Sequence, residues 1–194
     1  YTNAVDTRIR GGVNEDLEFS TVTIMYPDFE VTSEALDEEH VLLRFGDVIG
    51  SGPNQVPLGA TIHAAMLDLA ALFGNSPGHG GHFHAMLEPW EATNTWNMFT
   101  NGVQADGIEA VVAPSAVAGD TSLAMVPGGY HSFEMTADVQ AWAYDYRPNY
   151  GWVILPWEFG RDGFGIGSAE QAEEKARPQL RVYYSPGTLP QTDV

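Results

Sequence analysis

Short hydrophobic segments alternate with turn-forming residues along almost the whole chain. The segments are rich in leucine, β-branched and aromatic residues, and they cover residues 17–26, 38–45, 83–87, 108–113, 130–135, 151–156 and 179–184. Stretches such as GSGPNQVPLG and VPGGY separate them. Because short strands with turn signals between them are typical of all-β folds, the pattern predicts a β-sandwich and not alternating strand–helix units.

Two segments have helical character instead. Residues 136–146 (TADVQAWAYDY) place Val139, Trp142 and Ala143 on one helical face behind Thr136, a residue type that often caps a helix N-terminus. This pattern predicts one short helix with Thr136 as its N-cap. Residues 59–73 (GATIHAAMLDLAALF) also have high helix propensity in their alanines and leucines. The chain has no internal repeat or low-complexity linker, so we expect one domain over residues 1–194, with 185–194 as an extended tail.

Charge and cysteine content narrow the classes of function. Eight Lys and Arg residues against 26 Asp and Glu give a net charge of −18. A field of this sign repels phosphate and anionic lipid, which argues against nucleic acid and membrane surfaces as partners. The absence of cysteine excludes disulfides, thiolate nucleophiles and zinc fingers. No run of eighteen apolar residues occurs, so we expect no membrane insertion.

The order of phrases along the chain carries a family resemblance. From Val5 to Tyr184 the phrases are AVDTRIR, LEFSTVTI, HVLLRFGDVI, VPLGATIHAAMLDL, MLEPWEATNTWN, FEMTADVQAWA, NYGWVIL and SAEQAEEKARPQLRVYY. This succession resembles the DNRLRE-type (disaggregatase-related) domain and is similar to carbohydrate-binding module family 96. The resemblance implies an all-β jelly-roll β-sandwich with one short helix, and it implies that residues 62–72 (IHAAMLDLAAL) form a strand. It also implies a non-catalytic, extracellular role, and some relatives bind alginate.

Aromatic residues are the candidates for a sugar-binding surface, because apolar sugar faces stack on flat rings while carboxylates bind the hydroxyls. Trp90, Trp96, Trp142 and Trp152 lie inside the motif phrases, and we expect them in the core. The aromatic residues that are not part of a family motif are the better exposed platform. The predicted ligand-binding residues are Trp157, Tyr144, Tyr146 and Tyr150.

Carboxylates suggest a structural calcium site. Asp6 and Glu170 match family positions near the two ends of the chain, and Asp138 lies near the start of the predicted helix. With backbone carbonyls, these hard oxygen ligands suit Ca²⁺. Ion pairs of Asp6 and Glu170 with Arg8, Arg44 or Arg177 are the alternative.

The histidine-rich stretch HGGHFHAMLE allows a third interpretation. His82, His84 and Glu88, with His131 later in the chain, have a spacing similar to the metal ligands of cupin-type jelly rolls. The simpler interpretation, which we favour, is that His82 and His84 face solvent on a strand whose Phe83, Ala85 and Leu87 face the core.

These observations favour a non-catalytic protein, secreted to the extracellular space or the cell surface. The chain begins at Tyr1 without a methionine or a leader, as expected of a mature secreted protein. We expect a structural or adhesive subunit that self-associates, including into fibres, through a strand edge or a terminal segment. A polysaccharide-binding module is the alternative, and a cupin-like metalloprotein is a distant one.

Overall fold

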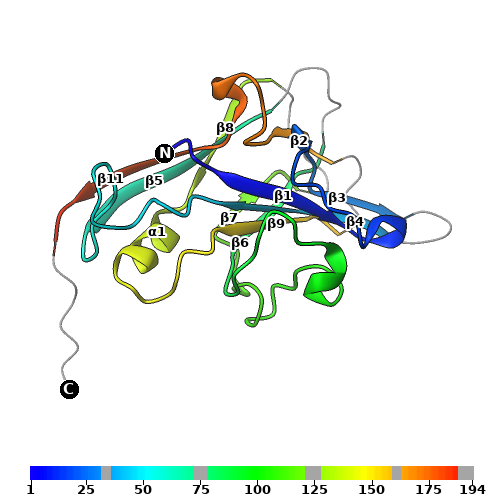
Figure 1. The fold of residues 1–194 in the computed structure, drawn as a ribbon, viewed down its shortest axis with the longest axis horizontal. Helices are drawn as coiled ribbons and strands as arrows, with labels where there is room; N and C mark the ends of the chain where they lie inside the picture. Colours follow the sequence, from blue (N-terminus) through cyan, green and yellow to red (C-terminus); the bar gives the residue numbers. More distant parts are fainter. Residues whose placement is uncertain (32–35, 72–77, 121–127, 159–162, 188–194) are drawn as a thin grey trace.

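Two antiparallel sheets face each other in the computed structural model, which describes residues 1–31, 36–71, 78–120, 128–158 and 163–187 (Figure 1). The larger sheet has the strand order β1-β4-β9-β6-β7, and β3 also pairs with β4. Its strands are β1 (Val5–Arg10), β3 (Asp28–Val31), β4 (Leu36–Arg44), β6 (Gly81–Ala85), β7 (Ala116–Ala118) and β9 (Trp152–Pro156). The predicted all-β sandwich is therefore confirmed.

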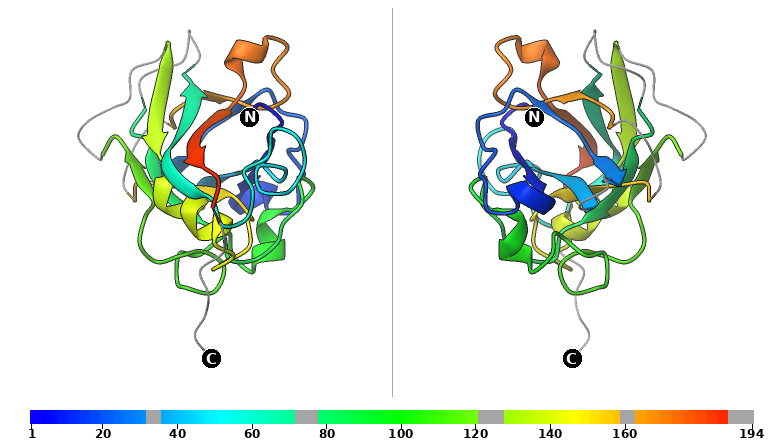
Figure 2. Two further views of the ribbon diagram at one scale, coloured as in Figure 1. Left: turned by 90° about the vertical axis from the view of Figure 1, so that its left-hand side faces the viewer. Right: turned by 90° about the vertical axis from the view of Figure 1, so that its right-hand side faces the viewer.

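The second sheet has the order β11-β5-β8, and a small ribbon lies beside it. Its strands are β5 (Thr61–Ala70), β8 (Tyr130–Glu134) and β11 (Gln179–Ser185), and the ribbon pairs β2 (Ile24–Met25) with β10 (Ile166–Gly167). Of the predicted C-terminal tail, residues 185–187 are described, and Ser185 belongs to β11; residues 188–194 lie outside the described part. The two layers are seen edge-on in Figure 2.

The main core lies between the two sheets. Alternate residues of each strand point inward, so that Leu43, Trp152 and Phe83 of the larger sheet belong to the same buried cluster as Leu67 and Leu180 of the smaller one. Part of the outer face of the larger sheet is buried as well. Residues 86–112, which include the short 3-10 helix η2 (Trp96–Phe99), pack over it and build a second apolar cluster. All four tryptophans predicted for the core, Trp90, Trp96, Trp142 and Trp152, are buried.

The predicted helix is present as α1 (Thr136–Ala143), with Val139, Trp142 and Ala143 buried. The predicted N-cap was wrong. Met135 occupies that position, and the Thr136 hydroxyl accepts a hydrogen bond from the Ala65 amide at 3.0 Å instead. The start of α1 therefore takes over from β8 as the hydrogen-bonding partner of β5 at Ala65.

Residues 61–70 form the central strand β5 and not a helix, as the family resemblance implied. This strand is hydrogen bonded to β11 on one side and to β8 on the other. Two neighbouring strands outweigh the intrinsic helix propensity of the alanines and leucines. Residues 72 and 73 of the same segment lie outside the described part of the chain.

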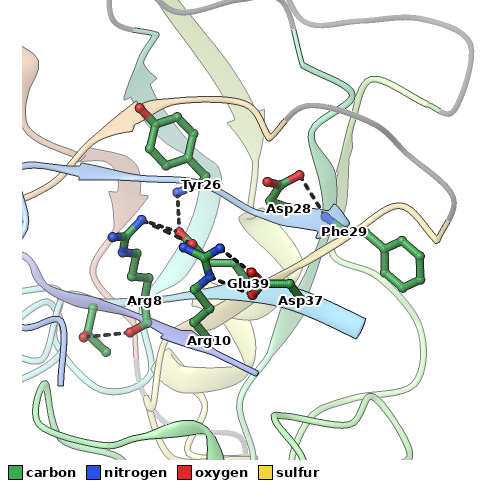
Figure 3. A network of polar contacts seen from close by, with 8 residues as sticks. Arg8, Arg10, Tyr26, Asp28, Phe29, Asp37 and Glu39 are labelled. Carbon is green, nitrogen blue, oxygen red and sulfur yellow. Dashed lines mark hydrogen bonds and ion pairs between the residues drawn. The ribbon is translucent and has the colours of Figure 1, made fainter. Parts of the chain in front are cut away.

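A partly buried polar network joins β1, β4 and the segment just before β3 (Figure 3). Arg8 donates to the Glu39 carboxylate at 2.9 Å, and Arg10 forms an ion pair with Asp37. The Tyr26 amide also donates to Glu39. Burial raises the pKa of Glu39, and the nearby Arg8 guanidinium opposes that rise. The network holds β1, β4 and the residue Tyr26 before β3 together, with Phe29 directed away from it (Figure 3).

Candidate functional site

The four aromatic residues predicted to bind a ligand are not brought together. Tyr150 precedes β9 and Trp157 follows it, so they lie at opposite ends of this strand. Tyr150 packs on the second apolar cluster, and its carbonyl accepts a hydrogen bond from Trp90. Tyr144 and Tyr146 follow α1, with ring centroids 5.6 Å apart. The sequence therefore predicted one platform where the structure has separate aromatic surfaces.

Trp157 lies in a groove on the outer face of the larger sheet. The groove has a volume of about 540 Å³, and its lining residues are Phe29, Glu38, His82, Leu155, Pro156, Trp157 and Glu158. The Trp157 indole donates a hydrogen bond to the Ala118 carbonyl at 3.0 Å, and it contacts the His82 ring edge-on, with the ring centroids 4.5 Å apart. These two contacts orient the indole. The combination of flat rings and two carboxylates suits sugar hydroxyls and apolar sugar faces.

His82 and His84 of β6 form a close pair beside this groove. His82 Nδ1 lies 3.2 Å from His84 Nε2, and His84 Nδ1 lies 2.8 Å from the Val111 carbonyl. His84 is only 4% exposed, so the predicted solvent-facing position was wrong for this residue. Residues 86–112 cover that face of the sheet, which sequence alternation alone cannot reveal. Phe83 and Ala85 are buried, as predicted for residues that face the core. Leu87, predicted to face the core as well, lies beyond the end of the strand and is partly exposed.

The other two residues of the cupin-like set do not join the histidine pair. His131 lies on β8 in the opposite sheet, opposite Leu69, and its ring contacts Phe164. Glu88 is exposed in the loop after β6. Among the described residues no group of three His, Cys, Asp or Glu side chains could hold one metal ion. The four-ligand arrangement typical of cupins is therefore not assembled.

Asp6 and Glu170, predicted as metal ligands, do come together. Asp6 is 2% exposed, and its Oδ2 accepts a hydrogen bond from the Ala169 amide at 2.8 Å. Its Oδ1 is buried without a hydrogen-bond partner. Burial raises the pKa of Asp6 to about 8, with a further contribution from the Glu170 carboxylate. The pair either shares a proton or requires a cation to neutralise it.

The third predicted metal ligand, Asp138, has other partners. Its Oδ2 accepts a hydrogen bond from Trp152 Nε1 at 2.6 Å, and Arg147 forms an ion pair with its Oδ1. The alternative arginine pairing of Asp6 is not seen either, because Arg8 binds Glu39 and Arg44 binds Glu91. Arg177 donates to the Gln171 carbonyl.

One edge of the smaller sheet, on β11, is only partly paired. Tyr1 occupies its first position: the Tyr1 amine donates to the Leu180 carbonyl at 2.7 Å, and the Leu180 amide donates to the Tyr1 carbonyl at 2.9 Å. This exchange is an antiparallel pair, so the backbone groups of Leu180 point away from β5. Sequence reasoning missed this contact, since its two residues are 179 positions apart.

The next two positions on this edge, Val182 and Tyr184, also direct their backbone groups outward. Val182 lies opposite Ala65, whose amide and carbonyl bond on the other side of β5, to Thr136 and Met135. Tyr184 lies opposite Ile62, whose amide bonds to the Gln140 side chain on that same side. Within the described part of the chain, no backbone group pairs with Val182 or Tyr184 along the outer edge. We call this stretch the β11 edge.

Comparison with known proteins adds no assignment: no family model matches the chain, and no curated protein matches it. The resemblance to the DNRLRE-type domain therefore stays a prediction. Among the described helices none is both long enough and apolar enough to cross a membrane.

Proposed function

We propose that the protein is a non-catalytic structural subunit of an extracellular or cell-surface assembly, and that copies associate through the β11 edge. The observation that carries this proposal is the unpaired outward backbone of Val182 and Tyr184, next to the antiparallel pair that Tyr1 has already begun. Unpaired strand edges accept strands from other chains, and many β proteins protect them with lysine, proline or a covering loop.

Side chains around the β11 edge supply apolar area for such a contact. Tyr183 is 58% exposed, and Tyr184 is 36% exposed on the other face of the strand. Each backbone hydrogen bond contributes only about 0.5–1.5 kcal/mol, so burial of these rings must provide much of the affinity. An extended segment from a second copy that runs antiparallel to β11 would form these backbone hydrogen bonds and also bury the tyrosine rings.

Proline substitution on the β11 edge tests the proposal without breaking the sheet. Val182→Pro and Tyr184→Pro each remove an outward amide that makes no bond to β5, and proline is tolerated on edge strands. We expect wild-type protein to sediment as large particles and both variants to sediment as monomers with wild-type circular dichroism. Val117→Pro, on edge strand β7 of the other sheet, is the matched control and should still assemble. A monomeric wild type, or assembly lost only in Val117→Pro, contradicts the proposal.

The groove beside Trp157 favours a second candidate function, polysaccharide binding. Its lining carboxylates Glu38 and Glu158, with a net charge of −18, favour neutral or amino sugars over uronates such as alginate. Affinity electrophoresis with β-glucan, xylan, chitosan and alginate tests this. Trp157→Ala and Glu158→Gln should abolish retardation, and Tyr146→Ala, which removes an exposed tyrosine elsewhere, should not. Equal retardation of all three variants contradicts a role for the groove.

A further inference from the structure

We propose that His82 and His84 together chelate a divalent transition-metal ion at the wall of the Trp157 groove. The two residues are neighbours on the same face of β6, because residues i and i+2 of a strand point the same way. Their facing nitrogens, His82 Nδ1 and His84 Nε2, lie 3.2 Å apart. A metal ion about 2.1 Å from each imidazole nitrogen spans this separation with an N–metal–N angle of about 100°, close to the tetrahedral value.

The hydrogen bond of His84 prepares its other nitrogen for a metal. The Val111 carbonyl can only accept, so His84 Nδ1 must carry the proton, and a lone pair remains on Nε2. A backbone carbonyl that fixes the ring in this way is the usual outer partner of metal-bound histidines. In the metal-free protein His82 Nδ1 donates its proton to that lone pair, and metal binding requires this proton to move to His82 Nε2.

The surroundings of both rings favour the neutral form that binds metals. Burial lowers the pKa of His82 and of His84, and for His82 the neighbouring His84 lowers it further. The pair also lies in an acidic surround, since Glu38 and Glu158 line the same groove as His82. An overall charge of −18 adds a long-range attraction for cations.

The expected metal and its remaining ligands follow from this donor set. Two imidazoles suit Cu²⁺, Zn²⁺ or Ni²⁺ far better than Ca²⁺ or Mg²⁺, which prefer oxygen. In the described residues no third His, Cys, Asp or Glu side chain completes a set with the pair. The remaining coordination positions are therefore left to water or to an oxygen ligand from another molecule.

Copper and zinc titrations of the full chain test the site. Calorimetry with ZnCl₂ and Cu²⁺ electron paramagnetic resonance should show one ion per chain, coupled to two nitrogens, and no comparable affinity for CaCl₂. His82→Ala should weaken binding at least tenfold and reduce the coupling from two nitrogens to at most one. His63→Ala is the matched control, because His63 lies on β5 and binds Ser185, and it should bind like wild type.

The variant His82→Ala carries the test, since His82 is partly exposed and its loss leaves the His84–Val111 bond in place; near-ultraviolet circular dichroism checks its fold. Copper that binds wild type without nitrogen coupling, or a folded His82→Ala that binds with unchanged affinity, overturns the proposal. The proposal is also overturned if neither zinc nor copper binds the wild-type protein. None of these results bears on the proposed association through the β11 edge, because sedimentation of the metal-free protein tests that proposal separately.

Discussion

Tyr1 and Leu180 exchange two backbone hydrogen bonds, and through them the start of the chain forms the first pair on the outer side of β11. The Tyr1 phenol is also partly buried, close to Tyr184 and Asp47, and burial raises its pKa. This short pairing both holds the N-terminal segment and limits how much of the β11 edge is open.

Removal of residues 1–3 should therefore expose Leu180 as a third open position. Two backbone hydrogen bonds and the burial of one tyrosine ring are lost, so we expect the free energy of unfolding to fall by about 1–3 kcal/mol. Because the open edge becomes longer, self-association should become stronger. Urea unfolding and sedimentation velocity measure the two effects. A shortened chain that is equally stable, or that associates less, would contradict this role of Tyr1.

Ionic strength should control self-association. Two copies that each carry a net charge of −18 repel one another, whereas the β11 edge itself attracts through backbone groups and tyrosines. Raising salt from about 0.01 M to about 1 M shortens the screening length from about 30 Å to about 3 Å. We expect the apparent association constant to rise at least tenfold, a change of about 1.4 kcal/mol. Dissociation on addition of salt, followed by light scattering, would show that ion pairs hold the copies together instead.

The fold class could be predicted from the sequence because it depends on local pattern. Alternation and turn residues indicate strands, and the helical spacing at residues 136–143 indicates α1. The burial of Trp142 and Trp152 followed from their places in the motif phrases. Local pattern also gives the face of a strand on which a residue lies, so that the shared direction of His82 and His84 was readable.

The sites could not be predicted, because they depend on which strands become neighbours. Phe29, Glu38 and Trp157 come from β3, β4 and the end of β9, and no local signal places these three segments around one groove. The β11 edge likewise depends on a contact between the two ends of the described chain. Asp6 and Glu170 were found by the family resemblance and by no property of their own neighbourhoods.

The carboxyl pair of Asp6 and Glu170 should make stability depend on pH. The pKa of Asp6 is raised from 3.8 to about 8 in the folded protein, so the unfolded chain loses this proton first as pH rises. The contribution of Asp6 to stability is thus fully present below about pH 4 and falls until about pH 8. Each pKa unit corresponds to about 1.4 kcal/mol, so the loss amounts to several kcal/mol.

Asp6→Asn isolates this effect, because the amide oxygen can still accept the bond from Ala169 and the side chain no longer titrates. Relative to wild type, the free energy of unfolding of the variant should rise steadily between pH 4 and pH 8. Urea unfolding at a series of pH values measures it. Glu88→Gln, an exposed carboxylate, is the control and should show a constant difference. A constant difference for Asp6→Asn would mean that Asp6 titrates normally.

Calcium provides a separate test of the same pair. If Ca²⁺ binds between Asp6 and Glu170, it replaces the proton of Asp6, and wild type should gain stability on addition of CaCl₂ at about pH 8. The gain is about 1.4 kcal/mol at ten times the dissociation constant. Glu170→Gln should lose the gain, while Glu158→Gln should retain it. A thermal shift that is the same in all three proteins would assign the calcium effect to general screening of the acidic surface.

Asp138 should be the carboxylate whose loss costs the most stability. It accepts from the buried Trp152 indole and pairs with Arg147, and it thereby fixes α1 against β9. Asp138→Ala leaves the Trp152 N–H buried without an acceptor, so we expect a loss of about 2–4 kcal/mol in urea unfolding. Asp138→Asn keeps an acceptor and should cost less. Glu134→Ala removes an exposed carboxylate just before the same helix and should change stability by under about 0.5 kcal/mol. An Asp138→Ala variant as stable as Glu134→Ala would mean that water replaces the carboxylate at Trp152.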